Sequence, residues 1–324
     1  MPRAIQIDKP GPASAMKWRE VEVGDPGKGE VRIRHTAVGL NYIDVYHRTG
    51  LYQLPLPLTL GMEGAGVVEA LGGGVDGLKA GDRVAYATTP LGAYSEERLI
   101  PADRVVKIPR DISDETAAAM MLQGMTVRYL IRETYRVGKG DTILVHAAAG
   151  GVGLILCQWA KHLGATVIGT VGSRRKAKLA RAHGCDHAIV YTEQDFTDRV
   201  RRITKGAGVP VVYDSVGRET FEGSLDCLAP RGLMVSFGNA SGPVPPFETG
   251  MLAAKGSLFL TRPSLPHYTA SRKDLTTTAN DLFRAVRSGA VEIGINQTYA
   301  LKDAAQAHRD LEGRKTTGST VLVP

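Results

Sequence analysis

A glycine-rich turn at residues 146–153 has the composition of a phosphate-binding site. An apolar segment at 142–145 leads through three alanines into Gly150-Gly151-Val152-Gly153, followed by a stretch with helical spacing at 154–163. A strand that enters a helix through such a turn directs backbone N–H groups, at the positive end of the helix dipole, toward a pyrophosphate. Gly150 would let the phosphates approach the backbone, and Gly153 would let the helix pack on the sheet. We expect a dinucleotide to bind here, although Ala148 replaces the first glycine of the usual G-x-G-x-x-G pattern.

The segment after the next apolar stretch indicates which dinucleotide is bound. Residues 165–171 lead into Ser173-Arg174-Arg175-Lys176, and no acidic residue occurs from 142 through 185. Enzymes that use NAD place a carboxylate about 20 residues past the glycine turn, where it binds the ribose hydroxyl. Here Arg174 and Lys176 could instead pair with a 2′-phosphate, whereas Arg175 and Lys178 should point elsewhere on that turn. The sequence therefore predicts NADPH as the cofactor rather than NADH.

Alternating strand-like and helix-like segments are expected to position this site. From residue 141 onward the pattern predicts a parallel, doubly wound sheet. Its expected strands are 142–146, 165–171, 188–191, 209–214 and 233–237, with a sixth at 258–261 after a Pro/Gly-rich loop at 242–250.

The first third of the chain has a different sequence pattern. Short β-like segments, broken by turns such as Gly72-Gly73-Gly74, predict an all-β lobe. A helix at 115–135, capped by Ser113 or Asp114, should lead into the second domain, and a helix at 273–287 and a strand at 319–323 should return the chain to the first lobe. The expected strands of this lobe are 30–38, 66–70, 83–87 and 93–100. Since 324 residues exceed one ordinary core, we expect two domains.

Charge and cysteine content exclude several classes of function. Lysine plus arginine exceed aspartate plus glutamate by 40 − 33 = 7, but the excess is spread along the chain, so nucleic acid is not expected as the main partner. The three cysteines, Cys157, Cys185 and Cys227, are odd in number and widely spaced, as is typical of reduced thiols. No apolar run approaches the ~18 residues of a membrane span, and the N-terminal MPRAIQIDKPG has no secretory core. We expect a cytoplasmic protein with no membrane partner.

Several motifs, taken together, resemble the quinone oxidoreductase branch of the medium-chain dehydrogenase/reductase superfamily. They are Asn41-Tyr42-Ile43-Asp44, Gly81-Asp82-Arg83-Val84, residues 146–153, Tyr213-Asp214-Ser215-Val216-Gly217 and Phe237-Gly238-Asn239. The resemblance covers nearly the whole chain. It implies an α/β protein in which a Rossmann domain with a doubly wound parallel sheet joins a GroES-like, β-rich catalytic domain, with the cofactor in the cleft between them. The implied domains are 1–122 (GroES-like), 123–262 (Rossmann) and 263–324 (return segment), and the implied assembly is a homodimer formed through the outer strand of the Rossmann sheet.

The resemblance also implies which residues surround NADPH. Asn41, Tyr42 and Asp44 would lie near the nicotinamide, and Thr126 and Val152 along the cofactor. In chain order the full expected set is Asn41, Tyr42, Ile43, Asp44, Thr126, Gly150, Gly151, Val152, Gly153, Ser173, Arg174, Lys176, Tyr191, Ser215, Phe237, Gly238, Asn239, Ala240, Pro263, Ser264, Leu265 and Arg314. Tyr191 could equally be a half-buried residue at the end of a strand.

The zinc ligands of the related alcohol dehydrogenases have no counterparts in this sequence. Gly61-Met62-Glu63 stands where those enzymes carry Gly-His-Glu, and Asn41 stands where their first cysteine ligand is expected. The segment His183-Gly184-Cys185-Asp186-His187 contains metal-binding residue types, but it falls at an expected turn between a helix and the third strand. We therefore expect no metal site.

Without a metal, an electron-poor acceptor needs only correct positioning beside the nicotinamide, so direct hydride transfer to a quinone is the predicted reaction. Tyr46, Tyr52 and Arg262 are candidates for binding the substrate or guiding a proton, and each could also be structural. One alternative is an NADPH-dependent reductase of enones or alkenals. Another is a non-catalytic relative that binds NADPH and RNA.

Overall fold

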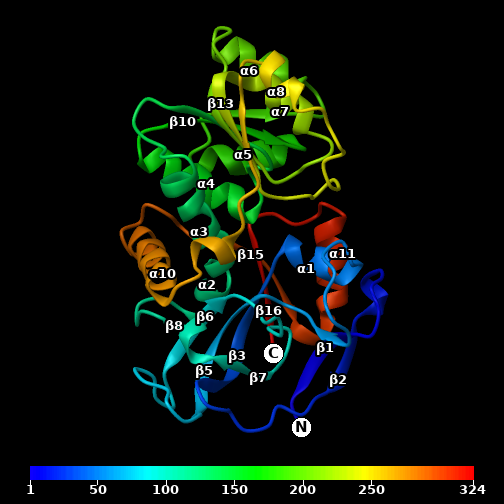
Figure 1. Cartoon of the computed structure of the whole chain (residues 1–324), viewed down its shortest axis with the longest axis vertical. Helices are drawn as coiled ribbons and strands as arrows, with labels where there is room; N and C mark the ends of the chain where they lie inside the picture. Colours follow the sequence, from blue (N-terminus) through cyan, green and yellow to red (C-terminus); the bar gives the residue numbers. More distant parts are fainter. The chain divides into compact units, whose positions relative to one another are not determined.

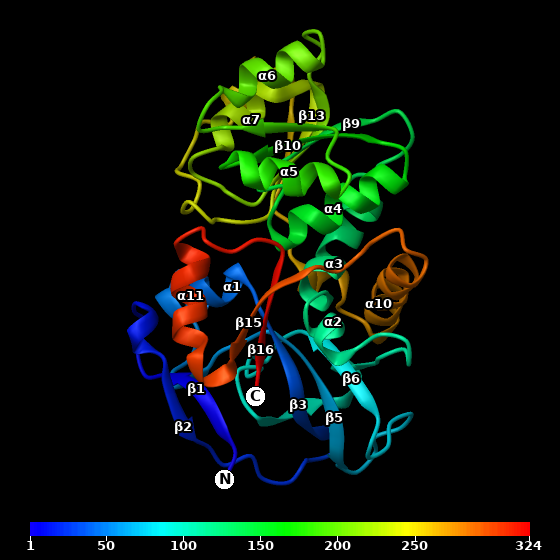
Figure 2. The same cartoon turned by 180° about the vertical axis from the view of Figure 1, so that it is seen from behind.

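The computed structural model describes all 324 residues, which form two compact units. Unit 1 comprises residues 1–125, 269–287 and 293–324, and unit 2 comprises residues 126–268 and 288–292. Figures 1 and 2 trace the chain through each unit from opposite sides. The domain boundaries expected from the sequence, after residues 122 and 262, remain predictions.

Unit 2 contains the predicted doubly wound sheet, in which six parallel strands follow the order β11-β10-β9-β12-β13-β14. These strands are β9 (Thr142–Val145), β10 (Thr166–Val171), β11 (His187–Val190), β12 (Val209–Asp214), β13 (Leu228–Ser236) and β14 (Phe259–Thr261). The sequence predicts β12 correctly to the residue, but it places the start of β13 too late, at residue 233. Pro230 and Gly232 are typical of a turn, yet the strand runs through them with a register shift in its pairing with β12.

Helices cover both faces of this sheet. The helices that follow β9 in this unit are α4 (Gly151–His162), α5 (Arg174–Ala182), α6 (Phe196–Ile203), α7 (Phe221–Cys227), α8 (Gly250–Ala254) and α9 (Leu265–Tyr268). Helices α4 and α5 pack together on one face, and α6 and α7 pack together on the other (Figures 1 and 2). The predicted start of α4 at residue 154 was three residues late, because the glycines of the turn already form its first helical turn.

The single helix predicted at 115–135 was wrong. The segment forms α2 (Asp114–Ala118), α3 (Met121–Tyr129) and a π-helical turn, η3 (Leu130–Thr134). Ser113 caps α2 as expected by accepting from the backbone N–H of Thr116. A new helix starts at Met121 because the Glu63 carboxylate, from a distant strand, accepts the backbone N–H of Leu122 at 2.7 Å.

Unit 1 is built on a seven-stranded sheet in the order β15-β16-β3-β5-β6-β8, with β7 also paired to β3. Its strands are β3 (Glu30–Leu40), β5 (Glu63–Leu71), β6 (Arg83–Ala87), β7 (Glu97–Pro101), β8 (Val106–Lys107), β15 (Ile295–Ala300) and β16 (Ser319–Val323). A smaller sheet contains β1 (Arg3–Ile7), β2 (Lys17–Glu20) and β4 (Leu58–Thr59). The strand predicted at 93–100 begins only at Glu97, because the backbone N–H groups of Ala93 and Tyr94 bond to the loop before β5.

The prediction that the first lobe is all β was wrong. It contains α1 (Tyr42–Thr49), and the return segment adds α10 (Arg272–Arg287) and α11 (Ala304–Glu312). Short 3-10 turns complete unit 1 at η1 (Ala13–Ala15), η2 (Ala102–Arg104) and η4 (Leu301–Asp303). Asn41 followed by Asp44 is a recognisable helix start, since the Asp44 carboxylate accepts the backbone N–H of Asn41 at 2.9 Å. None of the helices in either unit has the length and apolar character that crossing a bilayer requires.

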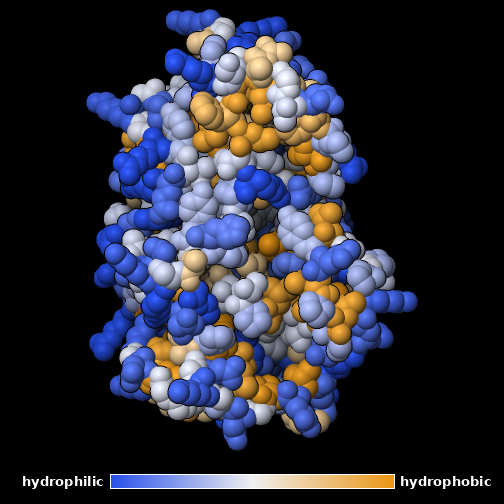
Figure 3. Space-filling view, in the orientation of Figure 1, coloured by the Kyte–Doolittle hydropathy of each residue, from blue (hydrophilic) through white to orange (hydrophobic).

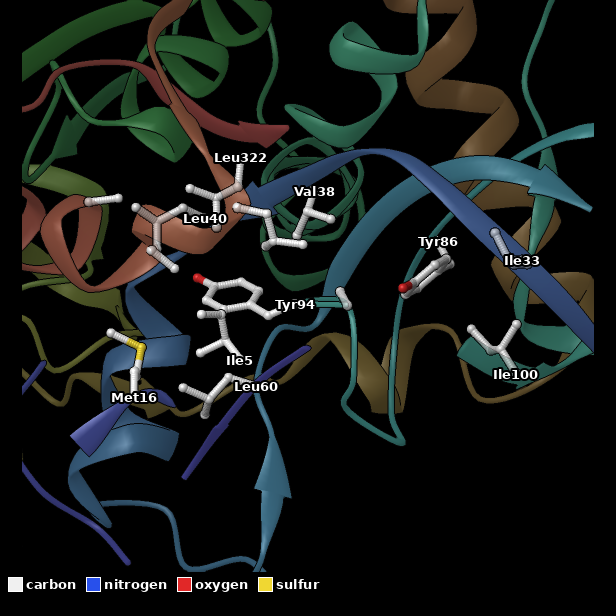
Figure 4. Packing of buried hydrophobic residues seen from close by; sticks show 14 of the residues in the cluster. Ile5, Met16, Ile33, Val38, Leu40, Leu60, Tyr86, Tyr94, Ile100 and Leu322 are labelled. Carbon is white, nitrogen blue, oxygen red and sulfur yellow. The ribbon is translucent and has the colours of Figure 1, made fainter. Parts of the chain in front are cut away.

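The core of unit 1 contains a tyrosine with a buried polar end. Figure 4 shows the Tyr94 ring packed among Ile5, Leu60 and other apolar side chains. Its hydroxyl donates to the Asp44 carboxylate at 3.0 Å and lies 3.0 Å from Nε2 of His308. The core therefore joins α1 to α11 through polar contacts as well as apolar packing.

A buried ion pair strengthens the same connection. The Arg48 side chain on α1 is only 1% exposed and donates to both carboxylate oxygens of Glu312 on α11, at 2.8 and 2.9 Å. Replacing Glu312 with glutamine would leave a buried guanidinium without its counter-charge, which is costly.

We expect Glu312→Gln to lower the free energy of unfolding by about 2 kcal/mol, measured by urea denaturation. The matched control is Asp25→Asn, which removes a carboxylate that is 98% exposed and paired with Arg32 at 3.7 Å. That change should leave the unfolding curve almost unaltered. Equal losses in the two variants would contradict a special role for the buried pair.

Candidate functional site

The turn between β9 and α4 presents an uncapped helix start. Gly150 is the N-cap residue, and no side chain accepts hydrogen bonds from the first turn of α4, whereas Ser173 caps α5 and Asp195 caps α6. A Cβ atom on Gly153 would lie 2.3 Å from the carbonyl oxygen of Ala147, so only glycine permits this packing. The first N–H groups of α4 thus have the arrangement that binds an anion.

The end of β10 provides a second wall. A Cβ atom on Gly172 would lie 2.7 Å from the Tyr191 hydroxyl, so the tyrosine side chain reaches across this glycine. Ser173 Oγ accepts the backbone N–H of Lys176 at 3.3 Å and thereby fixes the start of α5. Gly172, Ser173, Lys176 and Tyr191 are therefore neighbours, as the predicted phosphate site requires.

Arg174 already has a carboxylate partner. Its guanidinium donates to Glu193 from Nε at 2.9 Å, and this ion pair raises the pKa of Arg174 further above its ordinary value. The sequence analysis missed Glu193 because it lies beyond the acid-free stretch that ends at residue 185. A phosphate that binds the Nε group of Arg174 must therefore displace Glu193.

Two loops at the carboxyl ends of β12 and β13 are bound to each other. The backbone N–H of Ala240 donates to the carbonyl oxygen of Ser215 at 3.2 Å. A Cβ atom on Gly238 would lie 2.4 Å from that same oxygen, so Gly238 is required for the close approach. Asn239 and Phe237 flank Gly238, and the structure therefore brings together the predicted loop 237–240 and Ser215.

Arg262 lies beneath this loop. Its Nη1 group donates to the carbonyl oxygens of Ser236 at 2.8 Å and Gly238 at 3.2 Å. These bonds indicate a role for Arg262 in supporting the loop rather than in guiding a proton. The predicted residues Pro263 and Ser264 follow it, Leu265 is buried at the start of α9, and Thr126 is buried with its side chain hydrogen-bonded to Tyr129.

In unit 1 the Asn41 side chain takes part in a buried hydrogen-bond network. Its Nδ2 group donates to Glu63 at 2.6 Å, and its Oδ1 atom accepts from Nε2 of Gln123 at 3.1 Å. The Gln123 side chain in turn accepts from Ser319 Oγ at 2.8 Å. Burial raises the pKa of Glu63 to about 8 and that of Asp44 to about 7, although hydrogen bonds to both carboxyl groups act in the opposite direction.

The residues at the zinc position of the related dehydrogenases do not fit a zinc ion. Zinc needs thiolate, imidazole or carboxylate donors with free lone pairs. Here Met62 offers only a thioether, and the amide of Asn41 and both oxygens of Glu63 are engaged with one another and with α3.

The segment 183–187 does not form a metal site either. His183 Nδ1 contacts the Leu179 carbonyl oxygen, Asp186 accepts from Lys161 and from the Val167 backbone, and Cys185 is buried. No group of three or more histidine, cysteine, aspartate or glutamate side chains could hold a metal ion.

An aromatic cluster follows Asn41. The Tyr46 ring is buried, with centroids 5.5 Å from Tyr42 and 5.2 Å from Tyr52, and His47 lies 6.1 Å from Tyr52. Burial raises the pKa of Tyr42, and Arg314 acts in the opposite direction, so the predicted residues Tyr42 and Arg314 are within electrostatic reach of each other. Ile43 is half-buried beside them. The predicted contacts of these residues with a nicotinamide remain predictions.

Comparison with known proteins gives the family. The model of the alcohol dehydrogenase GroES-like domain matches residues 27–110, and the model of the zinc-binding dehydrogenase matches residues 151–268. A quinone oxidoreductase of Pseudomonas aeruginosa is 53% identical over the whole of both chains, and a 2-haloacrylate reductase of a Burkholderia species is 48% identical over all of this chain and 99% of its own. The crystal structure of Escherichia coli quinone oxidoreductase complexed with NADPH is 50% identical, with a TM-score of 0.98 over 99% of this chain and 100% of that one.

The match thus extends over the complete chain and includes both units. The chain belongs to the quinone oxidoreductase family of the medium-chain dehydrogenase/reductase superfamily.

Proposed function

We propose that this protein is an NADPH-dependent quinone oxidoreductase that transfers a hydride directly to its acceptor without a metal. The observation that carries the proposal is the uncapped glycine turn before α4, next to a strand whose end bears cations and no acidic residue. The Escherichia coli enzyme complexed with NADPH, which matches nearly the whole chain, supports this choice of cofactor.

The nucleotide binds through unit 2. The first N–H groups of α4, at Gly151, Val152 and Gly153, donate hydrogen bonds to the pyrophosphate at the positive end of the helix dipole. Lys176 binds the 2′-phosphate, next to Arg174, whose guanidinium is paired with Glu193. Tyr191 and Ser173 border that phosphate, and Ser215 with the 237–240 loop borders the ribose.

Bound NADPH supplies the hydride, and the protein supplies position and a proton path. As charge develops on the acceptor oxygen, a hydrogen-bond donor lowers the barrier. Tyr46 and Tyr52 are the proposed donors, because their rings are in contact and both carry hydroxyl groups, Tyr46 on α1 and Tyr52 three residues after its end. Arg262, the third candidate from the sequence, is better assigned to supporting the 237–240 loop.

A second reaction is favoured by one relative. The 2-haloacrylate reductase is 48% identical to this chain, and its name describes reduction of an electron-poor double bond. Such a bond accepts a hydride by the same direct route as a quinone. Reduction of activated alkenes is therefore our second candidate function.

Steady-state kinetics should separate these candidates and test the absence of a metal role. We expect NADPH oxidation with a benzoquinone and with 2-chloroacrylate to give a higher kcat/KM for the quinone. Dialysis against a strong chelator should leave both values unchanged, because the donors at the zinc position are bonded to one another. A chelator-induced loss that added Zn²⁺ restores would refute direct transfer without metal, and a higher value for the acrylate would favour the second function.

Exchange of one cation should test the choice of cofactor. In Lys176→Glu the ratio of kcat/KM for NADPH to that for NADH should fall about 10- to 100-fold, because a charge-assisted bond to phosphate is lost and a repulsion is gained. The control is Lys178→Glu, which makes the same charge change at an exposed position two residues further along α5. An unchanged ratio in Lys176→Glu, or an equal fall in the control, would refute the assignment.

We also propose that the protein forms a homodimer through β14, the edge strand of the unit 2 sheet, and that it resides in the cytoplasm. Phe259 on that strand is 62% exposed, and Figure 3 shows hydrophobic surface around β13 and α8. An exposed apolar edge strand is a ready surface for pairing. The three buried free cysteines support a reducing compartment.

Sedimentation velocity should show a dimer for the natural protein and a monomer for Phe259→Lys. The charge would be desolvated at an apolar strand edge, which disfavours association. Val323→Lys is the control, because it places the same charge at a 38% exposed residue on a strand of unit 1. A natural protein that sediments as a monomer would refute this assembly.

A further inference from the structure

A chain of buried hydrogen bonds crosses unit 2 at the carboxyl ends of three strands. His146, the residue after β9, is 2% exposed. Its Nδ1 atom lies 2.8 Å from Thr170 Oγ1 on β10, and its Nε2 atom lies 2.9 Å from Ser224 Oγ on α7. Ser224 Oγ then donates to Asp214 Oδ2, at the end of β12, at 3.1 Å. One imidazole therefore links the two strands that flank β9 in the sheet.

The direction of these bonds follows from counting hydrogens. Ser224 has a single hydroxyl hydrogen, and it points to the Asp214 carboxylate. Ser224 Oγ must then accept from His146, so the imidazole carries its proton on Nε2. In the neutral ring Nδ1 is an acceptor, and the Thr170 hydroxyl donates to it. Every bond in the chain consequently points toward Asp214.

Asp214 also fixes the turn after β12 through hydrogen bonds. Its Oδ1 atom accepts the backbone N–H groups of Val216 at 2.7 Å and Gly217 at 3.1 Å, and its Oδ2 atom also accepts from Thr220 Oγ1 at 2.8 Å. That turn contains Ser215, whose carbonyl oxygen binds the 237–240 loop. At the other end of this series of hydrogen bonds, the Thr170 carbonyl oxygen accepts the backbone N–H of Ala148 in the glycine turn at 3.0 Å.

The surroundings of His146 favour the uncharged ring. Burial lowers its pKa, and Asp214, the one charged group that faces it, acts in the opposite direction. The other groups against the ring are uncharged: the hydroxyls of Thr170 and Ser224 and the edge-on ring of Phe196, whose centroid is 5.0 Å away.

We propose that His146 is a positioning residue for the dinucleotide: through Thr170, Ser224 and Asp214 it fixes the glycine turn, the end of β10 and the turn after β12 relative to one another. This inference rests on the proposed function, because it concerns the same NADPH site. His146 itself need not touch the cofactor. Removing its two hydrogen bonds would leave the buried Thr170 hydroxyl without its acceptor and the Ser224 oxygen without its donor, and the three segments would lose their common support.

Binding measurements on paired variants test this proposal. In His146→Leu the Kd for NADPH, measured by calorimetry, should rise at least about tenfold, because two buried hydroxyls lose a partner. His146→Gln keeps one donor and one acceptor and should restore most of the affinity. Thr170→Val, which cuts only the link to β10 with little change in shape, should weaken NADPH by about threefold to tenfold.

A matched control separates positioning from general damage. Thr278→Val makes the same substitution at a buried threonine of α10 in unit 1 and should leave the Kd unchanged. If His146→Leu lowers stability but its folded fraction binds NADPH as tightly as the natural protein, or if glutamine rescues nothing, the proposal is overturned. If the natural protein itself takes up no NADPH, the proposed function fails instead, so the two failures are distinguishable.

Two further readouts depend on the imidazole itself. The ¹⁵N NMR signals of His146 should report a protonated Nε2 and an unprotonated Nδ1, and the opposite tautomer would contradict the bond directions. The ordinary pKa of histidine is about 6.5, and burial lowers the pKa of His146 in the folded protein. Below pH 6.5 the unfolded chain therefore binds a proton that the folded protein does not, and the fold loses stability as the pH falls. The free energy of unfolding should therefore fall below pH 6.5 more steeply for the natural protein than for His146→Gln, and identical profiles would contradict the neutral imidazole on which the bond directions depend.

Discussion

The close contact between Gly153 and the carbonyl oxygen of Ala147 is the constraint on which the nucleotide half of the molecule depends. With no side chain at 153, α4 can begin directly at the end of β9, and its first N–H groups point into the turn. Because the sheet is parallel, the ends of β10, β12 and β13 meet at the same edge. The remaining parts of this edge, including Tyr191 over Gly172 and the loop supported by Arg262, are arranged around that helix start.

In unit 1 a buried hydrogen-bond network stands where the related alcohol dehydrogenases carry zinc ligands. The Glu63 carboxylate accepts hydrogen bonds from Asn41 and from the start of α3, and the Gln123 side chain donates to the amide oxygen of Asn41. A closed set of buried hydrogen bonds can fix side chains as firmly as a metal does, provided that every member is satisfied. This network fixes the start of α1, from which the aromatic cluster of Tyr42, Tyr46 and Tyr52 extends.

The sequence was sufficient for features that depend on neighbouring residues. The alternation of strands and helices predicted the doubly wound sheet, and β12 was correct to the residue. Features that depend on distant partners were not accessible: α3 restarts at Met121 because of a carboxylate 59 positions earlier, and Arg174 pairs with Glu193 on a later segment. Helix α1 was missed although Asn41 and Asp44 form a recognisable capping pair, because those residues had been interpreted only as part of a cofactor motif.

The Glu193 carboxylate, which is paired with Arg174, would compete with a phosphate for that guanidinium in the proposed nucleotide site. In the absence of a ligand the Arg174 guanidinium, which is 85% exposed, is already paired with Glu193, so free phosphate or sulfate gains little from approaching this residue alone. In the proposed complex, a dinucleotide anchored at the glycine turn would hold its 2′-phosphate at a high effective concentration beside this pair, where it would compete with the carboxylate. In the proposed binding mode, the Glu193 carboxylate thus favours a ligand that is held at two points over a small anion that approaches Arg174 alone.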